Sequence, residues 1–313
     1  MDNICHSLAG AAIAQAGFAK RFRGATLLCV IGANIPDVDA ATYAFADSLA
    51  AVEFRRGWTH GLPALVCWTL LLAGCFLWWD RRRGEASDTE ARPAPMLAAA
   101  FLSVFSHTSL DWLNNYGVRW LMPFSNRWFY GDTLFIVDLV LLGVLAAGWW
   151  FSRRRHRDNV PRPSRPARIA LALALAYIAT MKGLSAISRS AAVRDLGLDP
   201  AGPGDLMVAP EPASILRREV LVRDDSSYIR YEALVQPGAV AIGAPTMRIP
   251  IGFTNPRALR AAATEQAKGF LRWSRFPYFV TGVDGDSATV LIGDVRYTAG
   301  TRESWAATRV VLR

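Results

Sequence analysis

Four long apolar runs dominate the first two thirds of the chain. They extend over residues 62–79, 96–113, 133–151 and 168–187. A helix rises about 1.5 Å per residue, so each run is long enough to cross a bilayer core of about 30 Å. The pattern therefore predicts four transmembrane helices.

Two shorter apolar segments precede these runs, at residues 4–19 and 24–36, and the basic turn Lys20 to Arg23 joins them. At 16 and 13 residues they are marginal as spans. We expect a short helical hairpin, either tilted across the bilayer or re-entrant and buried by the other helices.

Lysine and arginine concentrate in alternate loops, at residues 20–23, 81–83 and 153–165. Positively charged loops tend to stay in the cytoplasm, so these three loops are expected inside. The N-terminus, residues 37–61, residues 114–132 and everything after about residue 188 then lie on the outer face. Six crossings satisfy this arrangement.

From residue 191 the long apolar runs stop, and proline, glycine and charge increase. Alternating apolar positions predict strands, Pro256 begins a predicted amphipathic helix of about sixteen residues, and polar turns join the hairpins. The predicted strands are 218–222, 228–235, 276–283, 288–297 and 305–312, with turns at 224–227 and 284–286. The predicted fold is a membrane all-α bundle over residues 1–190 followed by a small soluble α+β or mostly β domain over residues 191–313.

Composition supports a membrane protein. Hydrophobic residues make up 52% of the 313 residues and charged residues 19%, which is more apolar than an ordinary soluble domain. The net charge of +9 could indicate a nucleic-acid partner, but the basic residues lie beside apolar runs rather than on a folded face with base-stacking groups. We therefore expect no nucleic acid. The four cysteines contain no Cys-x-x-Cys pair and are interpreted as small core residues: Cys5, Cys29, Cys67 and Cys75.

His107 and Asp111 stand four residues apart inside an apolar run. At this spacing both side chains project from one face of a helix and can reach a single cation. A buried histidine bonded to a helix neighbour is the alternative. Inside lipid the functional interpretation is favoured, because an ionisable group there is costly and is usually retained for function.

Three further elements carry histidine or aspartate at the ends of apolar segments. Asp37 and Asp39 follow a proline, a pattern also common in turns. His60 ends an Arg-Arg-Gly-Trp-Thr-His element whose Arg and Trp are typical of an interfacial anchor, which does not account for the histidine. His6 lies near the outer end of the first helix, where a capping role is the alternative.

The positions of the basic loops are independent of histidine and aspartate. They nevertheless predict that these side chains lie near the outer face, with His107 about one helical turn deeper: His6, Asp37, Asp39, His60 and Asp111. Imidazole and carboxylate ligands suit zinc, and also manganese or iron. A bound ion of this kind lowers the pKa of its water toward about 7 and supplies a hydroxide nucleophile. The predicted ligands of one or two such ions are His6, Asp37, Asp39, His60, His107 and Asp111.

Four more residues are candidates for the catalytic machinery. Asp132 stands at the outer start of the third long run and Asp138 about two turns inside it. Either could orient a ligand imidazole, and an interhelical salt bridge is an equal alternative for Asp138. Arg55 and Arg56 are expected to hold a phosphate or another anion, since a guanidinium offers two parallel donors.

These residues resemble the YdjM-like inner-membrane proteins, a family described as membrane-bound metal-dependent hydrolases. The resemblance covers about residues 1–150 and depends on His6 with Gly10, Ile-Pro-Asp-Val-Asp at 35–39, Arg-Gly-Trp-Thr-His at 56–60, His107 to Asp111, and the stretch from Tyr116-Gly117 through Pro123-Phe124-Ser125 to Asp132 and Asp138. The family often has histidine at the position of Arg55, so a ligand or proton carrier is absent there. The resemblance implies a bacterial inner-membrane location with multiple passes.

The order His6, Asp37, His60, His107, Asp111 is also similar to zinc-dependent phospholipase C and the single-strand-specific zinc nucleases. The later histidines of those enzymes have no counterpart, because His156 stands in the basic linker. This similarity favours a phosphoester substrate over a peptide.

We therefore expect an integral membrane metal-dependent hydrolase that acts on a phosphoester or ester of a lipid or lipid-linked substrate through a metal-bound hydroxide, with the C-terminal domain on the periplasmic side. The alternative is a non-enzymatic scaffold, whose C-terminal domain binds a protein partner, or a transporter that uses the polar residues as an ion path.

Overall fold

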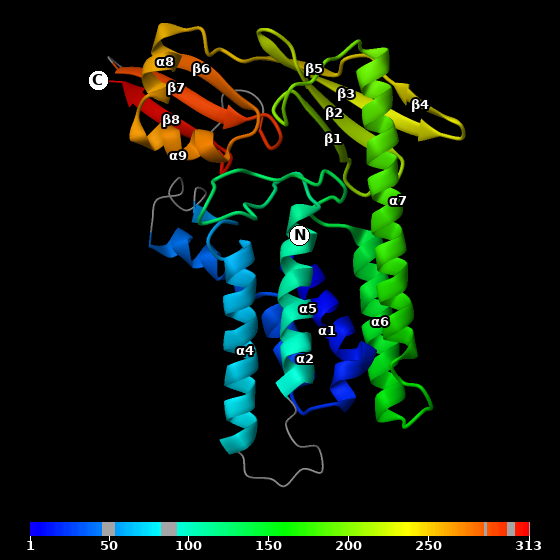
Figure 1. The fold of residues 1–313 in the computed structure, drawn as a ribbon. Helices are drawn as coiled ribbons and strands as arrows, with labels where there is room; N and C mark the ends of the chain where they lie inside the picture. The colour runs from blue at the N-terminus through cyan, green and yellow to red at the C-terminus, as the bar shows by residue number, and fades with distance from the viewer. Residues whose placement is uncertain (46–53, 83–92, 285–286, 299–303, 313) are drawn as a thin grey trace. The chain divides into compact units, whose positions relative to one another are not determined.

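The computed structural model describes residues 1–45, 54–82, 93–284, 287–298 and 304–312 (Figure 1). Two compact units are present. The first comprises Met1–Asp39 and Arg56–Gly183, and the second comprises Leu184–Arg313 with Ala40–Arg55. Arg83 and the predicted turn residues Gly285 and Asp286 lie outside the described residues.

The first unit is helical. In its core, apolar side chains such as Leu28, Leu72, Met96 and Ala99 are buried together. The helices are α1 (Asn3–Gly17), α2 (Ala25–Gly32), α4 (Leu62–Arg82), α5 (Pro93–Trp112), α6 (Leu139–Arg157) and the first part of α7 (Arg165–Asp195), with the 3-10 helices η1 (Phe18–Lys20) and η2 (Ile35–Ala44).

Two of the described helices, α4 and α7, are long and apolar enough to cross a membrane. The prediction of four clear spans was therefore wrong in number. Polar residues such as Ser103, His107 and Asp111 interrupt the apolar character of α5. Helix α6 begins only at Leu139, and its last turn is basic, so its apolar part is shorter than the run suggested.

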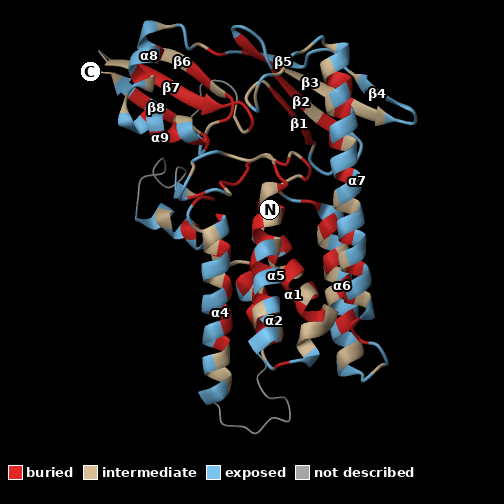
Figure 2. Ribbon diagram, viewed as in Figure 1, coloured by how far each residue is buried: buried red, intermediate tan, exposed pale blue. Residues whose placement is uncertain are grey.

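The outer faces of the helices are nevertheless apolar. Leu62, Val66, Leu70 and Trp78 of α4 are all at least half exposed, and Figure 2 shows exposed residues along the length of α4. Large apolar side chains also lie on the surface of α7, including Leu175. In a helical unit, exposed apolar faces of this extent indicate a surface solvated by lipid.

The N-terminal hairpin is present but short. Asp2 caps α1 by accepting hydrogen bonds from the backbone N–H groups of Ile4 and Cys5. Helix α2 has eight residues and spans only about 12 Å, so it cannot cross a bilayer core alone. This favours the re-entrant alternative and corrects the expectation of six full crossings.

Two of the four cysteines belong to the core, as predicted. Cys5 and Cys29 are buried, whereas Cys67 and Cys75 are exposed on α4. The interpretation of all four as core residues was therefore wrong for the pair on α4.

The C-terminal part of the second unit is built from two antiparallel sheets and two short helices, which agrees with the predicted α+β or mostly β domain. One sheet has the order β1-β2-β3-β4 with β5 also paired to β3, and the other has the order β6-β7-β8. The strands are β1 (Leu206–Pro210), β2 (Arg217–Arg223), β3 (Ser227–Gln236), β4 (Ala239–Ile242), β5 (Met247–Pro250), β6 (Pro277–Asp284), β7 (Ser287–Asp294) and β8 (Ala307–Leu312).

The predicted single helix after Pro256 is two helices, α8 (Pro256–Ala262) and α9 (Glu265–Trp273). Thr264 separates them because its side chain caps α9, accepting from the N–H of Ala267. The regularly spaced apolar residues that predicted one continuous helix therefore belong to two successive helices.

A buried ion pair stabilises the sheet that contains β7. Asp294 is fully buried and accepts hydrogen bonds from Nε and Nη2 of Arg296, both at 2.9 Å, and from Oγ of Ser274 at 2.7 Å. Burial alone would raise the pKa of Asp294, but the Arg296 guanidinium and these hydrogen bonds hold it below its usual range. The charge is thus compensated inside the domain.

Candidate metal centre

Four ligand-type side chains from three segments of the first unit meet at one point. Asp37 lies on η2, His60 lies in the turn before α4, and His107 and Asp111 lie on one face of α5. One ligand atom from each of the four lies within 4.8 Å of the others. These residues, Asp37, His60, His107 and Asp111, are called the ligand cluster below.

The distances within the ligand cluster are close to those that a single bound ion requires. His60 Nε2 lies 3.1 Å from His107 Nε2 and 3.4 Å from Asp111 Oδ2. Asp37 Oδ1 lies 3.9 Å from Nε2 of each histidine. Tetrahedral ligands at zinc distances of about 2.0–2.1 Å lie about 3.3 Å from one another. The four atoms therefore need only small movements to surround one ion.

The ring nitrogen of His107 that faces away from the cluster fixes its tautomer. His107 Nδ1 lies 2.7 Å from the carbonyl oxygen of Ala33, which can only accept a hydrogen bond. Nδ1 must therefore carry the proton, and in the neutral ring Nε2 presents its lone pair to the cluster.

His60 is fixed in the same way. Its Nδ1 lies 2.9 Å from Thr59 Oγ1 and 3.4 Å from Asp39 Oδ2. The Thr59 hydroxyl donates to Asp39 Oδ2 at 2.9 Å, so it can only accept from the ring. Nδ1 of His60 is therefore the donor, and in the neutral ring Nε2 carries a lone pair.

Two lone pairs thus face each other at 3.1 Å, beside two carboxylates. This arrangement is repulsive unless a proton or a cation lies between the atoms. Burial alone would lower the pKa of His60, but its contacts with Asp111 and Asp39 outweigh burial and raise it. The cluster therefore favours a positive charge at this point, which either a proton on His60 or a divalent metal ion would supply.

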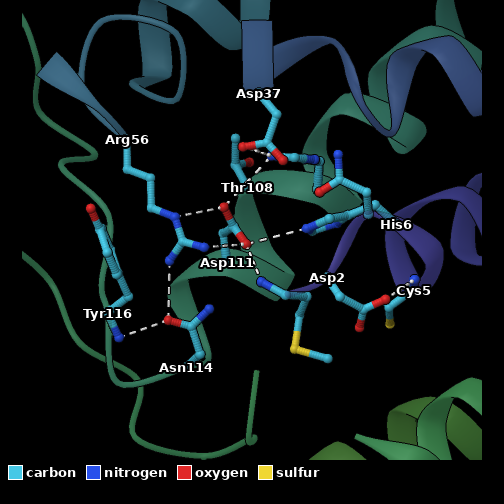
Figure 3. A network of polar contacts seen from close by, with 12 residues as sticks. Asp2, Cys5, His6, Asp37, Arg56, Thr108, Asp111, Asn114 and Tyr116 are labelled. Atoms are coloured by element: carbon cyan, nitrogen blue, oxygen red, sulfur yellow. Dashed lines mark hydrogen bonds and ion pairs between the residues drawn. The ribbon is translucent and has the colours of Figure 1, made fainter. Parts of the chain in front are cut away.

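Asp111 is held in place by several groups (Figure 3). Arg56 Nε lies 3.0 Å from Asp111 Oδ2, and Arg56 Nη2 donates to Oδ1 at 3.1 Å. His6 Nε2 lies 3.2 Å from the same Oδ1, and the His6 ring stacks on His107 with centroids 3.9 Å apart. The amino group of Met1 also contacts Oδ1. His6 therefore lies against the ligand cluster rather than within it.

Arg56 has partners other than the anion that the sequence predicted. Its Nη1 donates to Asn114 Oδ1 at 3.1 Å, and its guanidinium lies 4.3 Å from the ring centroid of Tyr116. Arg56 is buried and aims a two-pronged donor set at Asp111. The structure therefore assigns Arg56 to positioning Asp111.

Sequence reasoning missed Thr59 and Asn114. Thr59 joins Asp39 to His60, and Asn114 accepts from both Arg56 and the N–H of Tyr116, the latter at 2.8 Å. Both stand next to residues that the sequence did mark. Threonine and asparagine are common in polar loops, so nothing in the pattern distinguished them.

The remaining predicted residues take other positions. Asp39 lies on the Nδ1 side of His60 rather than beside the other ligand atoms, so it supports a ligand instead of joining the set. The Arg55 guanidinium lies 5.8 Å from the centroid of the Tyr43 ring in the second unit. Asp132 is half-buried with a φ of 48°, and no described contact places it in the ligand cluster.

Asp138 is a helix cap. It stands before the first residue of α6, not two turns inside a span, and accepts from the N–H of Leu141 at 2.9 Å. Tyr177 on α7 donates its hydroxyl to the other carboxylate oxygen at 2.8 Å. Asp138 thus joins α6 to α7, and the expected interhelical contact is a hydrogen bond rather than a salt bridge.

The family model of the YdjM inner membrane protein matches residues 1–186, which is more than half of the chain. The chain belongs to the YdjM inner membrane protein family. The YdjM match contains the whole ligand cluster together with His6, Asp39 and Arg56. No curated protein and no solved structure gives a significant match. YdjM membership and the two membrane-length helices assign the chain to a membrane.

Proposed function

We propose that this YdjM protein is a metal-dependent hydrolase of the bacterial inner membrane, with a divalent ion held by Asp37, His60, His107 and Asp111. The single observation that carries the proposal is the convergence of four ligand atoms within 4.8 Å of one another, with the two Nε2 atoms 3.1 Å apart beside two carboxylates. Zinc suits this donor set, and manganese or iron could use the same ligands. A bound divalent ion supplies Lewis acidity and activates water at neutral pH.

The chain's own residues prepare this centre. Asp39 and the Ala33 carbonyl orient the two imidazoles, and Arg56 orients Asp111. Of the four ligands, only Asp37 has an exposed side-chain fraction above zero, at 10%. Substrate and water therefore approach from the side of Asp37.

A lipid-borne phosphoester or ester is the proposed substrate. Val38, next to Asp37, is 52% exposed, and Trp58, two residues before His60, is 55% exposed. Apolar side chains at the rim of a site in a membrane protein suit acyl chains, and tryptophan is typical of the level of the head groups. A lipid or lipid-linked ester would present its head group to the ligand cluster from such a rim.

The test is metal analysis of the full chain purified in detergent. We expect bound metal in the wild type and its loss in both His107→Ala, which removes a ligand, and Asp111→Asn, which replaces a charged carboxylate ligand with a neutral, weaker amide oxygen. His156→Ala is the matched control, since His156 lies in the last turn of α6. Unchanged metal content in both ligand variants would refute the proposal.

Hydrolysis of lipid phosphoesters in mixed micelles is the second measurement. Activity should fall at least about 100-fold when the metal is removed by a chelator and return on adding zinc, because removal abolishes activation of the nucleophile. The alternative is a scaffold or an ion path built on the same buried charges. Retained metal with no hydrolysis of any lipid ester would favour that alternative.

A further inference from the structure

Helices α6 and α7 run antiparallel in the first unit and touch closely near the basic hairpin between them (Figure 1). The N–H of Ala167 donates to Ser152 Oγ at 2.8 Å, and a side chain at Gly148 would collide with Ala170. Small residues thus allow the two backbones to approach. A cavity of about 690 Å³ lies along this pair of helices and is called the α6–α7 groove below.

The wall of the α6–α7 groove is apolar over most of its length. Its apolar lining comes from both helices, with Val144, Ala147 and Phe151 on α6 and Ile169 and Leu173 on α7. Phe151, Ile169 and Leu173 are each about half exposed, at 55%, 48% and 54%. The volume lies within the range of about 300–1,000 Å³ that is usual for small-molecule sites.

One end of the α6–α7 groove is strongly basic. Arg154, Arg155 and Arg165 line it there, with Asp158 as the acidic residue of the lining. A second cavity of about 360 Å³ shares Arg154 and is lined also by Trp150, Arg153 and Arg157. The groove thus joins an apolar wall to a concentration of guanidinium groups.

Arg154 and Arg157 of this basic region are accessible, whereas Arg155 is half-buried and donates from Nη2 to the carbonyl oxygen of Pro161 at 2.7 Å. The side chains of Arg154 and Arg157 are 63% and 78% exposed, and Asp158 is their only acidic partner among the described residues. Between residues 153 and 168, seven arginines stand against one aspartate, which leaves a net charge of +6. Basic residues that only set the orientation of a membrane protein need no particular arrangement. Here some of the arginines also line a cavity, which indicates a binding site.

We propose that the α6–α7 groove binds one anionic phospholipid. Its acyl chain lies against the apolar wall from Val144 to Leu173, and its phosphate lies at Arg154, Arg155 and Arg165. Guanidinium groups bind phosphate oxygens through paired hydrogen bonds, and basic pockets beside membrane helices are typical sites for anionic lipids. This site is separate from the ligand cluster.

The experiment uses the full chain in phosphatidylcholine nanodiscs that contain a minor fraction of phosphatidylglycerol, with bound lipid counted by native mass spectrometry. The triple variant Arg154→Gln, Arg155→Gln and Arg165→Gln should bind phosphatidylglycerol about 100-fold more weakly. The matched control removes three arginines outside the groove, Arg21→Gln, Arg81→Gln and Arg82→Gln, and should bind phosphatidylglycerol as the wild type does.

A second pair of variants leaves every charge in place. Ala147→Trp fills the apolar wall and should abolish lipid binding, whereas Ala172→Trp, at an exposed position of α7 outside the groove lining, should not. Metal content should be unchanged in all of these variants, which separates this test from that of the ligand cluster. The proposal is overturned if both arginine triples lose lipid equally, if Ala147→Trp binds normally, or if inorganic phosphate displaces the lipid completely.

Discussion

Each histidine of the ligand cluster is held by the ring nitrogen that faces away from the other ligands. For His107 the holding group is a backbone carbonyl, and for His60 it is the Thr59–Asp39 pair. A fixed ring loses little rotational freedom when it binds an ion, so such support raises the affinity of a metal site. The histidines could be predicted as ligands from the sequence because imidazoles are rare beside membrane spans. The sequence could not distinguish an aspartate that binds the metal from one that supports a ligand.

Asp39→Asn tests this division of roles. The amide lacks the carboxylate's charge toward His60 Nδ1, so we expect metal affinity to fall by about 10–100-fold while saturating metal still restores the wild-type stoichiometry. Asp37→Asn replaces a charged carboxylate ligand with a neutral, weaker amide oxygen and should instead lower the stoichiometry itself. Competition titration with a chelating dye measures both quantities.

Asp199→Asn is the control for these two variants, because Asp199 is exposed in the C-terminal part of the chain. Its affinity and stoichiometry should equal those of the wild type. If Asp39→Asn lowered the stoichiometry as Asp37→Asn does, Asp39 would be a ligand after all.

Helix α2 contributes a supporting group to the ligand cluster despite its short length. Its C-cap residue Ala33 holds His107, and the chain then turns directly into η2, which carries Asp37. The apolar pattern predicted a short element here because the run itself is short. It could not predict that α1 and α2 touch at Gly10, since that contact depends on which faces the two helices present to each other.

Gly10→Ala tests the close approach of α1 and α2. A methyl group at this position would collide with the carbonyl oxygen of Cys29 and meet Ala33 Cβ at 2.9 Å. Separating the helices should destabilise the protein by about 1–3 kcal/mol and weaken metal binding, because Ala33 then moves away from His107. Thermal unfolding in detergent and metal titration measure the two effects.

Gly74→Ala is the matched control for this change. Gly74 lies on α4 and has no neighbour that a methyl group would meet, so alanine should stabilise the helix by up to about 1 kcal/mol. Equal stability of the two variants would show that the contact at Gly10 does not limit the packing of α1 on α2.

For the whole molecule, the sequence predicted the order of helical and β-sheet regions along the chain better than the number of membrane crossings. Helices in the first part and sheets in the second follow from apolar run length and from alternation, which are local properties. The predicted number of spans was wrong because α5 carries the polar residues of the site and α6 ends in arginines. Strands β1, β4 and β5 were missed because each is only four or five residues long.

A re-entrant α1–α2 hairpin would enter and leave the membrane by the same face. It would therefore leave the later loops on the sides that six crossings predict. We therefore predict that reporter fusions after Arg82 and after Asn159 lie in the cytoplasm and that a fusion at the C-terminus lies in the periplasm. Green fluorescent protein fluoresces inside and alkaline phosphatase is active outside, so paired fusions at each position provide mutual controls. In this predicted topology, the phosphate end of the α6–α7 groove would lie in the cytoplasmic leaflet and the ligand cluster would lie near the periplasmic face. A cytoplasmic C-terminus, with phosphatase inactive at that position, would contradict the alternation of basic loops on which this orientation depends.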